Sequence, residues 1–382
     1  MSSQKYGAKL FKASYFGAKC SFVFRRQKSK DSESCSVNNK ARYPLINIPP
    51  SWQRVTDSLY VYSAYWMEDD GYVKTVAVDS SISADSLFCS LWYADIPQPS
   101  KGSVAVESEE LRGTGFLYIH CKPSHVNIGI PIATSFYLEK DSSLGVKIPV
   151  LRSYHAGHSH NVSVIICTTP EYVTNSEAIG HLAYHQLIGV TSFIIYGQPQ
   201  FQGVNVVNVP WNFPFPERQR ISPAIEADCV LRARAAGATY AIALSWNEYL
   251  VPRYHRSLHS LFTEYSGSEK SIGFEIMRVD FCTEFNNSRE GLNYLDMLPL
   301  RKTHRKAEKS MKYVSVHSTS EHSGDKQKIS ENIISLHQYV SCFKNKRFRK
   351  GRIVQDPVFH RFDLDLKDAL TFWLSRDVMP ET

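Results

Sequence analysis

Short apolar runs separated by turn residues occupy the chain between Trp52 and about Val150. Runs of roughly four to eight residues that are rich in β-branched and aromatic side chains, and bounded by Gly, Pro, Asp or Ser, are typical of strands. The expected strands are Ser58–Trp66, Val73–Val78, Ser86–Tyr93, Thr114–Cys121 and Ala133–Leu138. This spacing predicts a small antiparallel β unit that packs against the rest of the chain.

The pattern changes after Gly157, where the apolar runs lengthen and helical spacing appears. Val162–Thr168 is a continuous apolar run, as in a strand that is buried on both faces of a parallel sheet. The expected elements, in order, are the strand Val162–Thr168, a helix up to Gly189, strands Thr191–Tyr196 and Val204–Val209, a helix up to Gly237, and strand Tyr240–Leu244. This β-α-β-β-α-β order predicts an open α/β sheet, whose ligands bind beyond the carboxyl ends of the strands.

Capping residues indicate where the two helices begin. Asn175 or Ser176 is the expected N-cap of the first helix. Ser222 is the expected N-cap of the second, with Pro223 as its first helical residue. Glycine at 189 and 237 suits the position just past each helix.

The formal net charge of +7 is concentrated in residues 1–42, which hold ten Lys/Arg and two Asp/Glu, a net of +8. The remaining chain is therefore close to neutral, which disfavours nucleic-acid binding by the folded part. A nucleic-acid-binding protein with a basic tail stays as an alternative, in which binding would depend on residues 1–42. A second basic cluster within residues 344–352 is expected to be a solvated surface. The expected parts are a disordered tail or transit peptide at 1–42, a β-rich unit at 43–155, an α/β domain at 156–350 and a C-terminal extension at 351–382.

The cysteine pattern indicates what kind of cellular compartment the protein folds in. Eight cysteines occur without a C-x-x-C pair, so zinc ribbons and thioredoxin-like redox sites have no support. Cys89 and Cys121 flank strand-like segments and could pair in an oxidising lumen. Sequons at Asn161 and Asn286 would permit N-glycosylation there. No apolar stretch approaches the roughly 18 residues of a membrane-spanning helix.

Several common active-site motifs are absent from the sequence. It has no P-loop, no G-x-G-x-x-G after a strand and no G-x-S-x-G elbow. His181 and His185 lie one helical turn apart, as in the zinc motif H-E-x-x-H, but Leu182 replaces the catalytic Glu. Three histidines at 155, 158 and 160 are expected to be solvent-exposed on a loop, with metal binding as the alternative.

Polar residues follow the last strand of the α/β pattern, at Ser245, Asn247 and Glu248. An enzyme that moves a sugar from a nucleotide diphosphate must neutralise two phosphates, and a divalent cation held by carboxylates at a strand end does so. Glu248 supplies one carboxylate, whereas Asn247 offers a neutral oxygen. The alternative is a capping Ser or Asn beside a surface Glu.

The segment Ser245–Pro252 resembles the Asp-x-Asp-Glu motif of glycosyltransferase family 92, with both aspartates replaced. Five further segments are similar to family motifs and occur in the same order along the chain: Val61–Tyr65, Ala183–Tyr196, Asp228–Arg232, Lys309 and Ser310 with Val316 and His317, and His337–Tyr339. The resemblance extends from about residue 52 to 345.

The resemblance implies a GT-A fold and an inverting transfer of a hexose, typically galactose from UDP-galactose, to a glycan acceptor. It implies a divalent metal of the Mn²⁺ type, which would be faced by Asn247, Glu248 and His317. It places Asp228, Ser245 and Lys309 near the nucleotide. A structural hydrogen bond for Asp228 and a surface ion pair for Lys309 are the alternatives. Membership also implies a Golgi or secretory-pathway membrane, although the sequence shows no anchor.

Inverting transfer needs a general base near the acceptor hydroxyl. Asp280 and Glu284, which follow an expected strand at Ile272–Val279, are the candidate carboxylates, and surface roles are the alternative. Loss of both metal-motif aspartates gives a second hypothesis for the whole chain. It would then be a catalytically inactive family member that binds a glycan or a partner enzyme.

Overall fold

The computed structural model describes the chain from Trp52 to residue 374 with gaps. The described ranges are 52–79, 86–108, 115–124, 129–138, 145–152, 163–197, 201, 205–215, 218–266, 273–285, 297–306, 312–320, 326–342 and 352–374. The tail at 1–42, the histidines at 155, 158 and 160, both sequons, Lys309 and most of the basic cluster at 344–352 lie outside these ranges.

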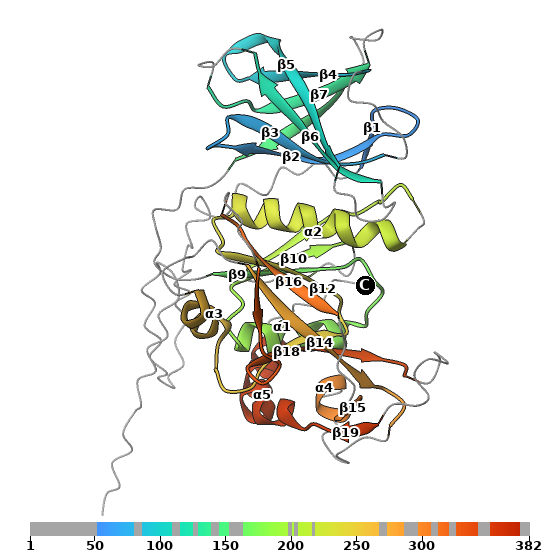
Figure 1. The fold of residues 1–382 in the computed structure, drawn as a ribbon, viewed down its shortest axis with the longest axis vertical. Coiled ribbons are helices and arrows are strands. Elements are labelled where there is room, and N and C mark those ends of the chain that lie inside the picture. The colour runs from blue at the N-terminus through green and yellow to red at the C-terminus, as the bar shows by residue number, and fades with distance from the viewer. Residues whose placement is uncertain are drawn as a thin grey trace, which may run out of the picture. The chain divides into compact units, whose positions relative to one another are not determined.

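The first part of the structure is a closed β-barrel (Figure 1). Its strands are β1 (Gln53–Arg54), β2 (Tyr60–Met67), β3 (Tyr72–Val78), β4 (Leu87–Tyr93), β5 (Ile96–Ser108), β6 (Phe116–Pro123), β7 (Ala133–Leu138) and β8 (Val146–Leu151). The strand order is β1-β2-β3-β6-β5-β4-β7-β8, and a parallel pairing of β2 with β8 closes the seven strands β2 to β8 into the barrel, while β1 pairs with β2 alone. All five strands expected in this region are confirmed. The unit is antiparallel as expected, except that the β2–β8 pairing is parallel.

A disulfide between Cys89 and Cys121 joins β4 to β6 across the intervening strand β5. Gly102 of β5 lies under the bond. A Cβ atom at this position would lie 2.6 Å from the Sγ atom of Cys121 and 2.8 Å from that of Cys89, so only glycine leaves room for the bridge. The expected pairing of these cysteines is confirmed.

The second part is an α/β domain whose first six elements are β9 (Val164–Thr168), α1 (Asn175–Leu187), β10 (Ser192–Tyr196), β11 (Val206–Val209), α2 (Arg218–Ala235) and β12 (Tyr240–Leu244). The four strands are parallel, in the order β11-β10-β9-β12. The predicted β-α-β-β-α-β order and open α/β sheet are therefore confirmed.

The sheet continues beyond β12 with antiparallel and mixed pairings. The remaining elements are β13 (Glu248–Pro252), α3 (Leu258–Ser266), β14 (Phe274–Cys282), α4 (Leu298–Arg301), β15 (His304–Lys306), β16 (Tyr313–Ser318), β17 (Gln327–Ile329), β18 (Ile334–Val340), β19 (Ile353–Gln355), η5 (Val358–Phe362) and α5 (Asp363–Leu374). β16 is antiparallel to both β12 and β14, so β14 runs in the same direction as β12. β18 pairs with β13 and β14 and links the β12–β13 turn to β14.

Both predicted helix starts need correction. The N-cap of α1 is Thr174, whose hydroxyl accepts the N–H of Glu177, while the Glu177 carboxylate accepts the N–H of Thr174. This reciprocal pair satisfies two backbone donors, which Asn175 alone could not do. Helix α2 already begins at Arg218, so Ser222 is not its cap and Pro223 lies within its second turn. Gly189 and Gly237 follow the two helices with positive φ values, as expected.

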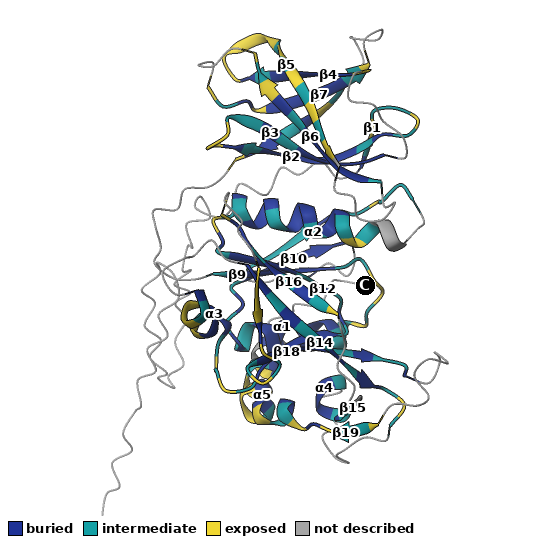
Figure 2. Ribbon diagram, in the orientation of Figure 1, coloured by how far each residue is buried: buried dark blue, intermediate teal, exposed yellow. Residues whose placement is uncertain are grey.

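Helices cover both faces of the parallel sheet (Figure 2). Helix α1 packs on one face, where Ile166 of β9 and Leu182 of α1 belong to a single buried core that also includes Leu366 of α5. Helix α2 packs on the other face, and its far side meets strands β2, β3 and β6 of the barrel. The continuous apolar pattern of β9 follows from this burial on both faces.

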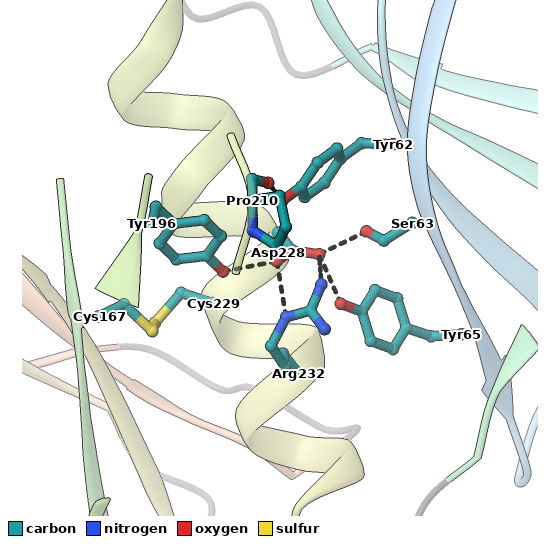
Figure 3. A network of polar contacts seen from close by, with 9 residues as sticks. All are labelled: Tyr62, Ser63, Tyr65, Cys167, Tyr196, Pro210, Asp228, Cys229 and Arg232. Carbon is teal, nitrogen blue, oxygen red and sulfur yellow. Dashed lines mark hydrogen bonds and ion pairs between the residues drawn. A yellow bond between two sulfur atoms is a disulfide. The ribbon is translucent and has the colours of Figure 1, made fainter. Parts of the chain in front are cut away.

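A buried carboxylate joins the barrel to the α/β domain (Figure 3). Asp228 of α2 is fully buried and accepts hydrogen bonds from Ser63 and Tyr65 of β2, from Tyr196 of β10, and from Arg232 one turn later. The Arg232 Nε atom lies 2.9 Å from the Oδ2 atom of Asp228. Burial raises the pKa of Tyr65 and Tyr196, so both phenols stay protonated and donate to the carboxylate.

Replacing Asp228 with Asn is expected to lower the free energy of unfolding by about 3–5 kcal/mol, because Arg232 would keep its charge in the interior without a counter-ion. Urea denaturation of the oxidised full chain, followed by circular dichroism, measures this difference. Asp95→Asn is the matched control, because Asp95 is exposed in a barrel turn and should change the stability by less than about 0.5 kcal/mol. Equal stabilities of the two variants would contradict the role of the buried pair.

Candidate ligand-binding site

The candidate site lies at the carboxyl ends of β9 and β12, which are adjacent parallel strands with Thr168 opposite Leu244. From β9 the chain passes through α1 to β10 on one side, whereas β12 lies on the other side and is reached through α2. Such a reversal of strand order leaves a crevice beyond the strand ends, where ligands of open α/β sheets bind. The backbone N–H of Thr169 donates to the carbonyl of Leu244, and its hydroxyl donates to Ser245 Oγ at 3.3 Å. The two loops are thus held together at their start.

A cavity of about 230 Å³ opens at this position. It is bounded by the loop after β9, the start of α1, the β12–β13 turn and the start of α4. Its lining residues are Glu171, Tyr172, Val173, Glu177, Trp246, Asn247, Tyr249, Met297 and Leu298. Tyr172 is 95% exposed, whereas Trp246 and Tyr249 are buried, so the cavity runs from the surface to the core.

Two buried histidines lie behind the cavity. His181 and His185 of α1 pack against Tyr249, and His181 also packs against Trp246. Burial lowers the pKa of His181, and it lowers the pKa of His185 to about 3, so both rings are neutral. His185 Nε2 accepts the N–H of Leu250 at 3.3 Å, and its Nδ1–H donates to the carbonyl of His181 at 2.8 Å. These histidines support the β12–β13 turn from the core.

Glu248 is buried with both of its oxygens engaged. Its Oε1 atom pairs with the Arg278 guanidinium at 2.8 Å, and its Oε2 atom accepts the N–H of Ser245 at 2.9 Å. Burial raises the pKa of this carboxyl, Arg278 and the Ser245 N–H oppose the shift, and the charges of Glu171 and Asp280 add to it. The carboxylate that was expected to face a metal is therefore committed to contacts within the protein.

A row of polar residues that includes Glu248 crosses the adjacent strands β13, β18 and β14. Glu248 of β13 lies opposite Gln338 of β18, which lies opposite Asp280 of β14. Directly opposed residues share a sheet face, and so does Arg278, two residues before Asp280. Asp280 lies within β14 and not after it as expected. Within the described ranges its half-buried carboxylate has no hydrogen bond or ion pair, which leaves it available to a ligand.

Asn247 is tied to the neighbouring strand. Its side-chain N–H donates to the carbonyl of Tyr339 at 2.9 Å, and the Tyr339 N–H donates to the carbonyl of Asn247 at 3.0 Å. These bonds fix the turn against β18. The amide oxygen of Asn247 has no partner among the described residues, which leaves it available to accept from a ligand.

The other predicted site residues do not gather here. His317 of β16 lies opposite Ala241, near the amino end of β12, and hydrogen-bonds Glu226 of α2. It is therefore at the other end of the strand from Glu248, and the expectation that both face one metal needs correction. Glu284 follows β14 and accepts from Ser341 and from the N–H of Cys342, beside the Cys282–Cys342 disulfide.

Asp228 has both oxygens filled by the network between barrel and α2, so it offers no free lone pair to a nucleotide. This matches the structural alternative for that residue. Lys309 lies outside the described residues. Across the described ranges, no three His, Cys, Asp or Glu side chains converge as a metal-binding group.

Sequence reasoning missed Arg278, Glu171 and Gln338. Arg278 stands two residues before Asp280 in a strand, so alternation alone places both on one face, but nothing local indicates that Glu248 is its partner. Glu171 follows β9 by three residues, and the rule that ligands bind past the ends of parallel strands could have found it.

Comparison with known proteins adds no family assignment. No protein-family model matches the chain, and no curated protein matches it either.

Replacing Arg278 with Gln is expected to lower the free energy of unfolding by about 1–3 kcal/mol at neutral pH, because the buried Glu248 carboxylate loses its cation. The pKa of Glu248, already raised, would rise further, and a carboxyl whose folded pKa is raised gains stability as the pH falls through that pKa. The loss should therefore be smaller at pH 5 than at pH 7 in urea denaturation. Lys328→Gln is the control, since its exposed pair with Glu275 contributes less than about 1 kcal/mol. A loss that grows towards acid pH would contradict this account.

Proposed function

We propose that the chain is a glycosyltransferase of the GT-A type that accepts a nucleotide-diphosphate sugar in the crevice beyond β9 and β12. The observation that carries the proposal is the position of the cavity. It lies at the reversal of strand order and is lined by both diverging loops, through Glu171–Val173 and Trp246–Asn247. The cavity is one part of the crevice in which open α/β sheets bind nucleotide ligands. The resemblance of several segments to glycosyltransferase family 92 supports the same conclusion from the sequence.

The proposed reaction is an inverting transfer of a hexose, with galactose from UDP-galactose as the donor that the resemblance favours. The acceptor hydroxyl oxygen attacks the anomeric carbon, and the bond from that carbon to the diphosphate oxygen breaks. The electron pair of that bond leaves with UDP, and a base takes the proton of the hydroxyl. Asp280 is the proposed base, because its carboxylate has no other partner among the described residues and lies in the polar row beside Glu248.

The family resemblance implies Mn²⁺, and the residues expected to hold it do not fit a metal site. Glu248 has both oxygens engaged, Asn247 is tied to Tyr339, and His317 lies at the other end of β12. No step of the proposed transfer is therefore routed through a metal.

The same contacts favour a second candidate function, a catalytically inactive glycan- or partner-binding protein of this fold. A site whose former metal carboxylate is neutralised by Arg278 has lost the usual means of stabilising a leaving diphosphate. The crevice and its polar row would then serve recognition alone.

The disulfides bear on localisation. Cys89–Cys121, Cys167–Cys229 and Cys282–Cys342 join strands and helices across the described core. Such bonds persist in oxidising compartments, which supports a place in the secretory pathway, with the Golgi as the proposed site. None of the helices in the described ranges has the length and apolarity of a membrane span.

The direct test uses the full chain with UDP-galactose and a mixture of glycan acceptors, with Mn²⁺ present or chelated. Release of UDP and transfer of galactose are expected, and Asp280→Asn should slow transfer about 10²–10⁴-fold through loss of the base. Asp95→Asn, the same change on the barrel surface, should leave the rate unaltered.

Calorimetric titration with UDP separates the two candidate functions. Binding without turnover for any tested donor would select the inactive protein. Neither binding nor turnover with UDP, UDP-galactose or UDP-glucose would refute the nucleotide-sugar proposal.

A further inference from the structure

The geometry points to a neutral saccharide ring, free of phosphate, as the ligand of the cavity between Tyr172 and Trp246. The inference rests on the proposed function only in taking a saccharide as the ligand, and it requires neither a nucleotide nor a metal. It specifies which part of a sugar substrate this cavity recognises.

The charges around the cavity exclude a phosphate as its preferred occupant. Two carboxylates, Glu171 and Glu177, line it, and the lining residues that the structure describes include no Lys or Arg. Arg278, the cation of the adjoining row, is already paired with Glu248. A phosphate placed here would lie beside two carboxylates, and like charges repel.

Carboxylates and aromatic rings together suit a sugar. Sugar hydroxyls are donors, and the oxygens of Glu171 and Glu177 are acceptors only. The exposed aromatic ring of Tyr172 offers a face on which the C–H groups of a pyranose can stack, while the buried side chains of Trp246 and Tyr249 form the apolar inner wall. Pockets of this kind combine apolar walls with a few polar groups that fix the orientation of the ligand.

Two hydrogen-bonding atoms of residues that line the cavity have no partner among the described residues. Trp246 is 5% exposed, and its indole N–H has no acceptor in the described structure. Asn247 is half-buried, and its side-chain oxygen has no donor within the described ranges. Buried donors such as this indole N–H are rarely left without partners, and a sugar hydroxyl can both accept and donate a hydrogen bond.

The size of the cavity sets a limit on the ligand. Pockets for drug-sized molecules measure roughly 300–1,000 Å³. A volume of about 230 Å³ is smaller, so it admits one sugar ring and not a whole nucleotide sugar.

Saturation-transfer NMR on the full chain tests the inference with galactose, glucose, mannose and N-acetylglucosamine as probes and UDP as the anionic comparison. At least one neutral sugar should receive saturation, and an excess of UDP should not displace it. Tyr172→Ala and Glu171→Gln should each weaken its binding about fivefold or more. Both residues are exposed, so neither change threatens the fold.

Tyr254→Ala and Glu264→Gln are the matched controls, because both residues are exposed and lie outside the cavity. They should leave sugar binding unchanged. The inference is overturned if no neutral sugar receives saturation, if the cavity variants bind as well as the controls, or if UDP displaces the sugar. If the sugar inference fails but UDP still binds to the Tyr172→Ala variant, the nucleotide-sugar proposal is upheld. Failure of the sugar inference is thus distinguishable from failure of the proposed function.

Discussion

Burying a charge in a protein interior is costly unless its lone pairs all find donors, and Asp228 meets that condition only where three parts of the chain converge. The barrel contributes Ser63 and Tyr65, the parallel sheet contributes Tyr196, and α2 contributes Arg232. The barrel is thus joined to α2 by buried hydrogen bonds. Because α2 leads directly into β12, the same contacts help to set the strand end where the candidate site lies.

The fold could be predicted from the sequence wherever local pattern and burial agree. Tyr240–Leu244 is apolar on both faces and was predicted with its observed bounds. β5 was missed because Pro97, Pro99 and Gly102 break the local pattern of its thirteen residues, although the strand pairs with β4 on one side and β6 on the other. The start of α2 was missed because proline is most common at the first helical position, whereas Pro223 lies in the second turn of the helix.

The candidate site was only partly predictable, because its chemistry depends on contacts between distant segments. Position after β12 was enough to select Ser245, Asn247 and Glu248. Their actual partners, Arg278 and Tyr339, come from β14 and β18, which reach the turn through pairings that no local motif encodes. A motif shows which ligands a site could offer, and the surrounding strands decide which lone pairs remain available.

The Cys89–Cys121 disulfide passes over β5 at Gly102, so a substitution of this glycine bears on the formation of the disulfide. A Cβ atom at position 102 would meet the two bridged sulfur atoms at 2.6 and 2.8 Å, and it would also approach the backbone oxygen of Lys122 to 3.0 Å. The sulfur contacts are the shorter ones, so an alanine there opposes the formation of the bridge most directly. Such a substitution would therefore be felt most in an oxidising compartment, as a failure of oxidative maturation.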